Sequence, residues 1–155
     1  MNECKLSEIN WTKAAVFAGG DRSHYRTDFD CFVGVDRGSL WVLEEELPLA
    51  LAVGDFDSVT VEERQLIQER AQHFVQAQPE KDDTDLELAL LTIFEKNPQA
   101  QVTIFGALGA RIDHMLANVF LPSNPKLAPY MRQIEIEDGQ NLISYCPEGI
   151  SQLEP

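Results

Sequence analysis

Cysteine is scarce in this chain, and long apolar runs are absent. The three cysteines are dispersed and form no Cys-x-x-Cys pair, which argues against a disulfide framework and against a structural zinc site. Cys31 stands in an apolar segment, so we expect it to be buried. No apolar run approaches the ~18–20 residues of a membrane-spanning helix. The N-terminal residues also lack the basic and then apolar pattern of a secretory signal. We therefore expect a cytoplasmic protein.

Basic residues are also few. The chain has 12 lysines and arginines against 26 aspartates and glutamates, which gives a formal net charge of −14. This charge repels nucleic acid, so we expect no polynucleotide partner. It also repels a nucleoside triphosphate, unless a divalent metal neutralises the carboxylates of the binding site. Neither the Gly-x-x-x-x-Gly-Lys-Ser/Thr motif nor the Gly-x-Gly-x-x-Gly motif occurs. A bound nucleotide would therefore be held by metal and side chains.

Short apolar segments alternate with helical patterns along most of the chain. The apolar segments fill consecutive positions, as expected for strands covered on both faces, and they are residues 14–18, 31–35, 49–53, 73–77 and 101–105. Helical periodicity appears over residues 40–47, from Val61 onward, and most clearly from Leu86 to Phe94. This alternation predicts an α/β fold with a parallel, Rossmann-like sheet and helices on both of its faces.

The pattern changes near Pro122. Residues 123–130 are rich in proline and are predicted to be a linker that follows an α/β domain over residues 1–122. Beyond the linker, residues 132–137 alternate between polar and apolar, and Asp138-Gly139 is a hairpin turn signal. We expect residues 131–155 to begin a second, partial β domain with this hairpin.

Two aspartate clusters at predicted strand ends carry the clearest chemical signal. Asp55 and Asp57 follow the third predicted strand, and in an extended segment their side chains project to the same side. Converging carboxylates repel each other unless a cation lies between them, and oxygen-only ligands of this kind suit Mg²⁺. A polar turn is the alternative interpretation, because aspartate and serine, here Ser58, are common turn residues.

The second cluster consists of Asp82, Asp83, Thr84 and Asp85, directly before the clearest helical stripe. Threonine and aspartate are favoured N-caps, and acidic residues in the first turn complement the helix dipole, so a structural role explains part of this pattern. A cap needs one residue, whereas this segment offers three acids and a hydroxyl. Ligands of open α/β sheets bind beyond the carboxyl ends of the strands, where both clusters are expected.

A third segment, residues 106–118, follows the fifth predicted strand and leads into a helix. Its small residues let the backbone approach a ligand closely. Arg111 is suited to bidentate phosphate binding, and Asp113 to capping the helix or holding substrate. His114 and Asn118 lie one turn apart on one helix face, although a lone histidine is more often structural.

Gly20 and Asp36 also stand at strand ends, where either would face the crevice. Taken in order, the strand-end segments resemble those of thiamine pyrophosphokinases. The resemblance runs from Val16 to about Pro122 and consists of residues 18–20, 35–38, 53–58, 81–85 and 106–114. It implies an α/β catalytic domain followed by a β-sandwich, of which this chain would hold only the first hairpin. It also implies a homodimer with the active site in a cleft between subunits.

The reaction implied by the resemblance transfers pyrophosphate from ATP to the hydroxyl of thiamine, giving thiamine diphosphate and AMP. At the matching positions, Mg²⁺ would be held by Asp55, Asp57 and Asp85, and the catalytic residues would be Asp57, Asp85 and Asp113. Substrate and nucleotide contacts would come from Gly20, Asp36, Ser58, Asp82, Thr84, Arg111, His114 and Asn118. Such chemistry depends on positioning and charge neutralisation, so a carboxylate site without a dedicated nucleophile is reasonable.

Two other interpretations remain open. The sequence from Asp55 to Asp57, after an apolar strand, also resembles the nucleophile motif of haloacid dehalogenase phosphatases. Asp55 would then attack phosphorus, and Asp57 would act as acid and base. That class carries the motif on its first strand, whereas two predicted strands precede it here. The second alternative is a truncated, non-catalytic nucleotide-binding remnant.

Overall fold

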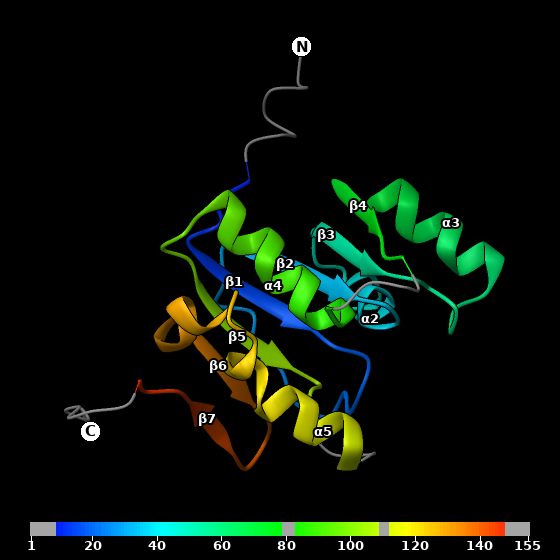
Figure 1. Ribbon diagram of the computed structural model, residues 1–155. Coiled ribbons are helices and arrows are strands. Elements are labelled where there is room, and N and C mark those ends of the chain that lie inside the picture. The colour runs from blue at the N-terminus through cyan, green and yellow to red at the C-terminus, as the bar shows by residue number, and fades with distance from the viewer. Residues whose placement is uncertain (1–8, 79–82, 109–111, 148–155) are drawn as a thin grey trace.

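The computed structural model describes residues 9–78, 83–108 and 112–147, and its framework is a seven-stranded sheet (Figure 1). The strands are β1 (Lys13–Phe17), β2 (Cys31–Val35), β3 (Leu49–Gly54), β4 (His73–Gln76), β5 (Gln101–Phe105), β6 (Ile134–Glu137) and β7 (Leu142–Ser144). Their order across the sheet is β4-β3-β2-β1-β5-β6-β7. Neighbouring strands are parallel except for the β6–β7 pair. The direction of winding reverses between β1 and β5, and such switch points are where open α/β sheets bind ligands.

Helices cover both faces of the sheet, as the sequence predicted. On one face lie α2 (Gly38–Glu44) and α3 (Val61–Arg70), which contribute Trp41 and Ile67 to an aromatic-rich core. The opposite face carries α4 (Asp85–Lys96), which crosses in front of the strands in Figure 1. The predicted stripe of α4 is buried from Leu86 to Phe94. Because β2 and β3 are buried along their whole length, their consecutive apolar residues are explained by this double cover.

Reciprocal capping boxes begin both α3 and α4. The Thr60 hydroxyl accepts a hydrogen bond from the backbone of Glu63 at 3.1 Å, and the Glu63 carboxylate accepts one from the backbone of Thr60 at 2.8 Å. Thr84 and Glu87 repeat the arrangement at 3.1 and 2.7 Å. Each box satisfies two backbone groups that the first turn leaves without helical partners, so it fixes where the helix begins.

The segment predicted to be a linker is folded against the core. Helix α5 (Ile112–Val119) is followed by the 3₁₀ turns η1 (Leu121–Ser123) and η2 (Ala128–Gln133). Leu121 and Leu127 are buried in this stretch. Proline is compatible with the first turn of a helix, which explains how a proline-rich segment forms turns. No helix in the described part of the chain is long and apolar enough to cross a bilayer.

The predicted C-terminal hairpin forms, but it extends the α/β sheet. β6 pairs in parallel with β5, with Ile134 beside Val102 and Ile136 beside Ile104. Both isoleucines are fully buried, whereas Glu135 and Glu137, which alternate with them, are only partly buried. The alternating pattern of this strand therefore reflects one face packed on the common core. The expected β-sandwich is not confirmed, and the division into two domains stays a prediction.

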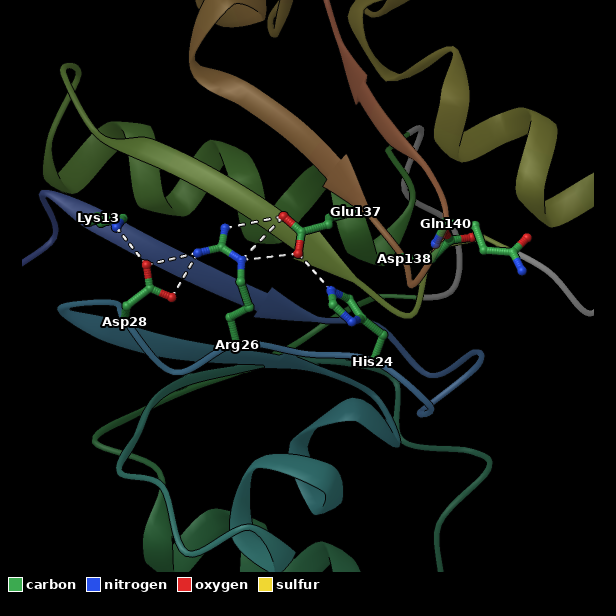
Figure 2. Close-up of polar contacts among 7 residues, drawn as sticks. All are labelled: Lys13, His24, Arg26, Asp28, Glu137, Asp138 and Gln140. Carbon is green, nitrogen blue, oxygen red and sulfur yellow. Dashed lines mark hydrogen bonds and ion pairs between the residues drawn. The ribbon is translucent and has the colours of Figure 1, made fainter.

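A charged network fastens this hairpin to the connection between β1 and β2 (Figure 2). Arg26 donates to Glu137 through Nε at 3.0 Å and Nη2 at 3.1 Å, and His24 Nε2 lies 2.7 Å from the same carboxylate. Arg26 also donates to Asp28 at 2.7 Å, which pairs with Lys13 at 3.1 Å. Burial alone raises the pKa of Glu137, but the bonds from Arg26 and His24 outweigh it and lower the pKa. The network thus links the start of β1, the connection between β1 and β2, and the end of β6.

Candidate active site

A cavity of about 400 Å³ lies at the switch point, beyond the carboxyl ends of β1, β2 and β5. Its lining residues are Ala18, Gly19, Gly20, Val35, Asp36, Arg37, Ser58, Gly106, Ala107, Leu108, His114 and Asn118. Small and apolar residues form most of the wall, with a few polar groups among them, as is usual for ligand sites. Five residues predicted from the sequence to bind substrate or nucleotide line this cavity, namely Gly20, Asp36, Ser58, His114 and Asn118.

Three partly buried aspartates, which we name the acidic trio, converge at the same sheet edge. Asp36 follows β2, Asp55 follows β3, and Asp85 is the first residue of α4. Their carboxylate oxygens lie within 4.8 Å of one another. Burial, a hydrogen bond shared with Asp85 and the charges of Asp85 and Asp55 raise the pKa of Asp36 to about 7. Carboxylate oxygens at this spacing fit a hard divalent cation, which would relieve their repulsion.

The backbone around Asp36 is held in an unusual conformation. Asp36 has φ 50° and Phe56 has φ 60°, both in the left-handed region. Phe56 is buried and stacks on Phe74 with ring centroids 4.9 Å apart, and its N–H donates to Asp36 Oδ1 at 3.0 Å. A Cβ atom on Gly54 would overlap the Asp36 carboxylate, so glycine is required there. Each strained residue costs about 1–3 kcal/mol, and such residues cluster at functional sites.

Asp57 is not part of the acidic trio. The left-handed Phe56 turns the chain, and the exposed Asp57 donates its N–H to Asp55 Oδ1 at 3.0 Å. The segment is therefore not the extended one that the sequence-based prediction assumes. The physical reason is the left-handed turn at Phe56, which cannot be predicted from an apolar residue between two acids. The metal-binding and catalytic roles assigned to Asp57 stay predictions.

The second acidic cluster divides into separate roles. Asp83 accepts a hydrogen bond from Lys126 Nζ at 2.8 Å and so ties this loop to the segment after η1. Thr84 is the N-cap of α4, while Asp85 joins the acidic trio. The structural explanation thus accounts for Thr84, and its contact with substrate stays a prediction. Asp82 lies outside the described residues.

Helix α5 supplies the remaining predicted residues. His114 and Asn118 line the cavity from one face of the helix. Asn118 Nδ2 donates to the carbonyl of Ala107 at 3.0 Å, which fixes the loop after β5. Asp113 is exposed in the first turn and is not one of the cavity-lining residues, so its catalytic role stays a prediction. Arg111 lies outside the described residues.

Two features of the site were not predicted from the sequence. Asp36 was expected to contact substrate, whereas the structure places it with Asp55 and Asp85 in a group suited to a metal. Arg37 received no role, although it lines the cavity and donates through Nη1 to the carbonyl of Ser58 at 2.7 Å. The signal for Asp36 lies in the strand order, because neighbouring parallel strands β2 and β3 bring their carboxyl ends together.

Comparisons with known proteins point to a single family. Residues 23–133 match the family described as thiamin pyrophosphokinase, catalytic domain. The chain is 37% identical over 145 residues to a thiamine pyrophosphokinase of Bacillus subtilis, covering 90% of this chain and 66% of that protein. A crystal structure of a thiamin pyrophosphokinase family protein from Enterococcus faecalis aligns with a TM-score of 0.82 and 48% identity, covering 89% of this chain and 66% of the other.

The crystal structure of Bacillus subtilis thiamine pyrophosphokinase aligns with a TM-score of 0.67 and 35% identity, over 84% of this chain and 62% of that one. The chain therefore spans a little under two thirds of the length of each of these relatives. The family match over residues 23–133 includes the three residues of the acidic trio.

Proposed function

The chain belongs to the thiamin pyrophosphokinase family, and on that premise we propose that it transfers a pyrophosphoryl group from ATP to the hydroxyl of thiamine. The products would be thiamine diphosphate and AMP. One observation carries the proposal: three aspartates from separate segments converge beside a cavity at the switch point of the sheet. A site of this kind suits a ligand that brings phosphate and a metal together.

We propose Mg²⁺ as the metal, held by Asp36, Asp55 and Asp85. Burial, a hydrogen bond with Asp85 and the charges of Asp85 and Asp55 raise the pKa of Asp36, and a cation among the three carboxylates would offset these charges. When bound, the metal would neutralise charge on the phosphates and on the departing AMP. The sequence-based prediction also includes Asp57 among the ligands. Asp57 lies two residues after Asp55 and is exposed, so a metal shared with Asp55, or the water shell of that metal, is within reach of a local rearrangement.

The cavity residues would position the two substrates. The loop of Gly106 and Ala107 offers backbone groups and little side-chain bulk, so a ligand can approach the end of β5 closely. Ser58, His114 and Asn118 present polar groups to the same space. Because the transferred group needs alignment and charge neutralisation, these residues act by holding the hydroxyl of thiamine in line with the phosphate.

The proposal also keeps the predicted substrate or nucleotide contacts of Thr84, Asp82, Asp113 and Arg111. A homodimer and a cytoplasmic location also belong to it. Both rest on the sequence and on the family relationship.

The activity is tested by incubating the protein with ATP, Mg²⁺ and thiamine and separating the products by chromatography. AMP and thiamine diphosphate formed in equal amounts are the expected result. Phosphate released without any need for thiamine would indicate a hydrolase, and a phospho-aspartyl enzyme trapped on Asp55 would indicate the phosphatase mechanism. Absence of any product would refute the activity for this chain.

Variants locate the activity in the acidic trio. Asp55→Asn removes one charge without changing side-chain size and is expected to lower turnover about 100-fold or more. Asp57→Asn measures the contribution of the acid outside the trio. Glu69→Gln is the matched control, because Glu69 is exposed on α3, away from the cavity lining. Equal activity of Asp55→Asn and wild type would place the chemistry elsewhere.

A further inference from the structure

Arg37 carries a positive charge into an acidic site. It is the one arginine or lysine among the described residues that line the cavity, in a chain whose formal net charge is −14. Its side chain is 51% exposed, so the guanidinium is accessible to a ligand. We infer that Arg37 binds the phosphate chain of the nucleotide. The identity of that ligand rests on the proposed function, whereas the binding of an anion follows from the geometry.

The guanidinium is only partly engaged by the protein. Its Nη1 donates to the Ser58 carbonyl at 2.7 Å, and its nearest approach to Glu63 is 4.0 Å, which is too long for a hydrogen bond. A guanidinium has five N–H donors in a planar fork. Arg37 can therefore hold the loop of Ser58 with one nitrogen and present further donors to a phosphate, whose oxygens match the fork.

The backbone at Arg37 is fixed against the end of β1. A Cβ atom on Gly38 would overlap the Phe17 carbonyl oxygen, so only glycine allows this close approach. The Arg37 carbonyl also accepts the N–H of Leu40 at 3.0 Å, at the start of α2. These contacts hold Arg37 at the switch point, where β1 and its neighbours end.

Arg37 directly follows Asp36 of the acidic trio, and both residues line the cavity. Consecutive Cα atoms lie about 3.8 Å apart. A phosphate chain can therefore contact a cation on the trio and the Arg37 guanidinium at the same time. The acids alone offer such an anion no favourable charge. Arg37 thus supplies anion binding that the metal ligands cannot, and it couples that binding to the position of the Ser58 loop.

The inference is tested by calorimetric titration of the whole chain with ATP, pyrophosphate and adenosine, each in the presence of Mg²⁺. Arg37→Gln is expected to weaken ATP and pyrophosphate about tenfold to 100-fold, the usual range for hydrogen bonds between charged partners. The affinity for adenosine should change less than twofold. Arg37→Lys keeps the charge but loses the fork, so its affinities should fall between those of wild type and Arg37→Gln. Arg70→Gln, at an exposed arginine of α3, is the matched control and should change none of them.

Two further measurements separate a phosphate contact from a structural effect. The salt dependence of ATP binding should become shallower in Arg37→Gln, because a charge contact is lost, whereas a distorted pocket would leave the slope unchanged. Thermal unfolding shows whether each variant folds. An ATP affinity of Arg37→Gln within twofold of wild type would overturn the inference, and so would equal losses of affinity for ATP and adenosine. If Arg37→Gln does not fold, the affinities of Arg37→Lys decide the question, and the same limits apply to them. Wild type that fails to bind pyrophosphate would overturn it too.

The outcome is independent of turnover. If the wild-type chain makes no thiamine diphosphate but Arg37→Gln selectively loses ATP and pyrophosphate binding, the proposed activity fails and the anion site stands. If turnover occurs and Arg37→Gln binds ATP normally, the activity stands and the anion site fails.

Discussion

Replacing Asp36 with asparagine should stabilise the metal-free protein while it weakens the metal site. The Asp36 side chain is partly buried and faces Asp55 and Asp85, which raises its pKa from 3.8 to about 7. Asparagine has nearly the same shape and keeps an oxygen that can accept the Phe56 N–H. It removes the ionisable group, so the repulsion within the trio falls and the backbone contact is retained.

The size and pH dependence of this effect follow from proton binding. A raised pKa means that the folded protein binds the Asp36 proton more tightly than the unfolded chain does. The resulting stability is present below about pH 4 and is lost as the pH rises to about 7. Each pH unit in this interval corresponds to about 1.4 kcal/mol, which sets an upper limit of about 4 kcal/mol. Water and side-chain relaxation screen part of the repulsion, so we expect a gain of about 1–3 kcal/mol for the variant at pH 8.

The assay is urea unfolding, followed by circular dichroism, with EDTA present, at about pH 4.5, 6 and 8. The advantage of Asp36→Asn should be small at the lowest pH, grow toward pH 7 and then level off. Asp57→Asn is the control, because Asp57 is exposed and outside the trio, and its stability should stay within about 0.5 kcal/mol of wild type. Mg²⁺ should stabilise wild type more than Asp36→Asn. A variant less stable than wild type at pH 8, or a difference that does not vary with pH, would refute the reasoning.

Three further predictions concern other parts of the fold. Thr84→Ala removes the N-cap of α4 and should lower the free energy of unfolding by about 1 kcal/mol, measured by urea unfolding; an unchanged midpoint would contradict the capping role. Glu137→Gln weakens the bonds from Arg26 and should cost about 1 kcal/mol at pH 7. Because the pKa of Glu137 is lowered, this cost should shrink as the pH falls below about 4.5, and a cost that persists in acid would exclude the charge as its source. Cys146 is exposed and should react with iodoacetamide at pH 8. Burial raises the pKa of Cys31 to about 12 and should protect this thiol until the chain unfolds. Labelling is followed by peptide mass spectrometry, and early labelling of Cys31 would show that its burial is not maintained.

The sheet and its helices were predictable because their signals are local. Strands such as β2 and β3 are continuous apolar runs, and α4 has an unambiguous stripe from Leu86 to Phe94. The place of β6 was not predictable in this way. Its alternating pattern is equally satisfied by a separate sheet or by the edge of the existing one, and only the pairing of Ile134 and Ile136 with β5 decides between them.

The convergence of aspartates at the strand ends was predictable, but the presence of Asp36 among them was not. Clustered aspartates at strand ends indicated a metal, and Asp55 and Asp85 do converge. Asp36, rather than Asp57, lies beside Asp55 and Asp85 for two reasons that a sequence pattern does not contain. One is that β2 lies beside β3, and the other is that Phe56 is left-handed.

The site and the scaffold respond to substitution in opposite ways, and this distinguishes their roles. At Asp36 the fold maintains a left-handed residue and a carboxylate that repels its neighbours, both of which reduce stability in the metal-free protein. At Thr84, one residue from the trio, the side chain stabilises the helix that carries Asp85. Asp36→Asn should therefore raise stability and lower metal affinity, whereas Thr84→Ala should lower stability and disturb the metal only through the start of α4. If both changes lowered stability alike, the acidic trio would be a structural element of the sheet edge, and the case for a metal there would be lost.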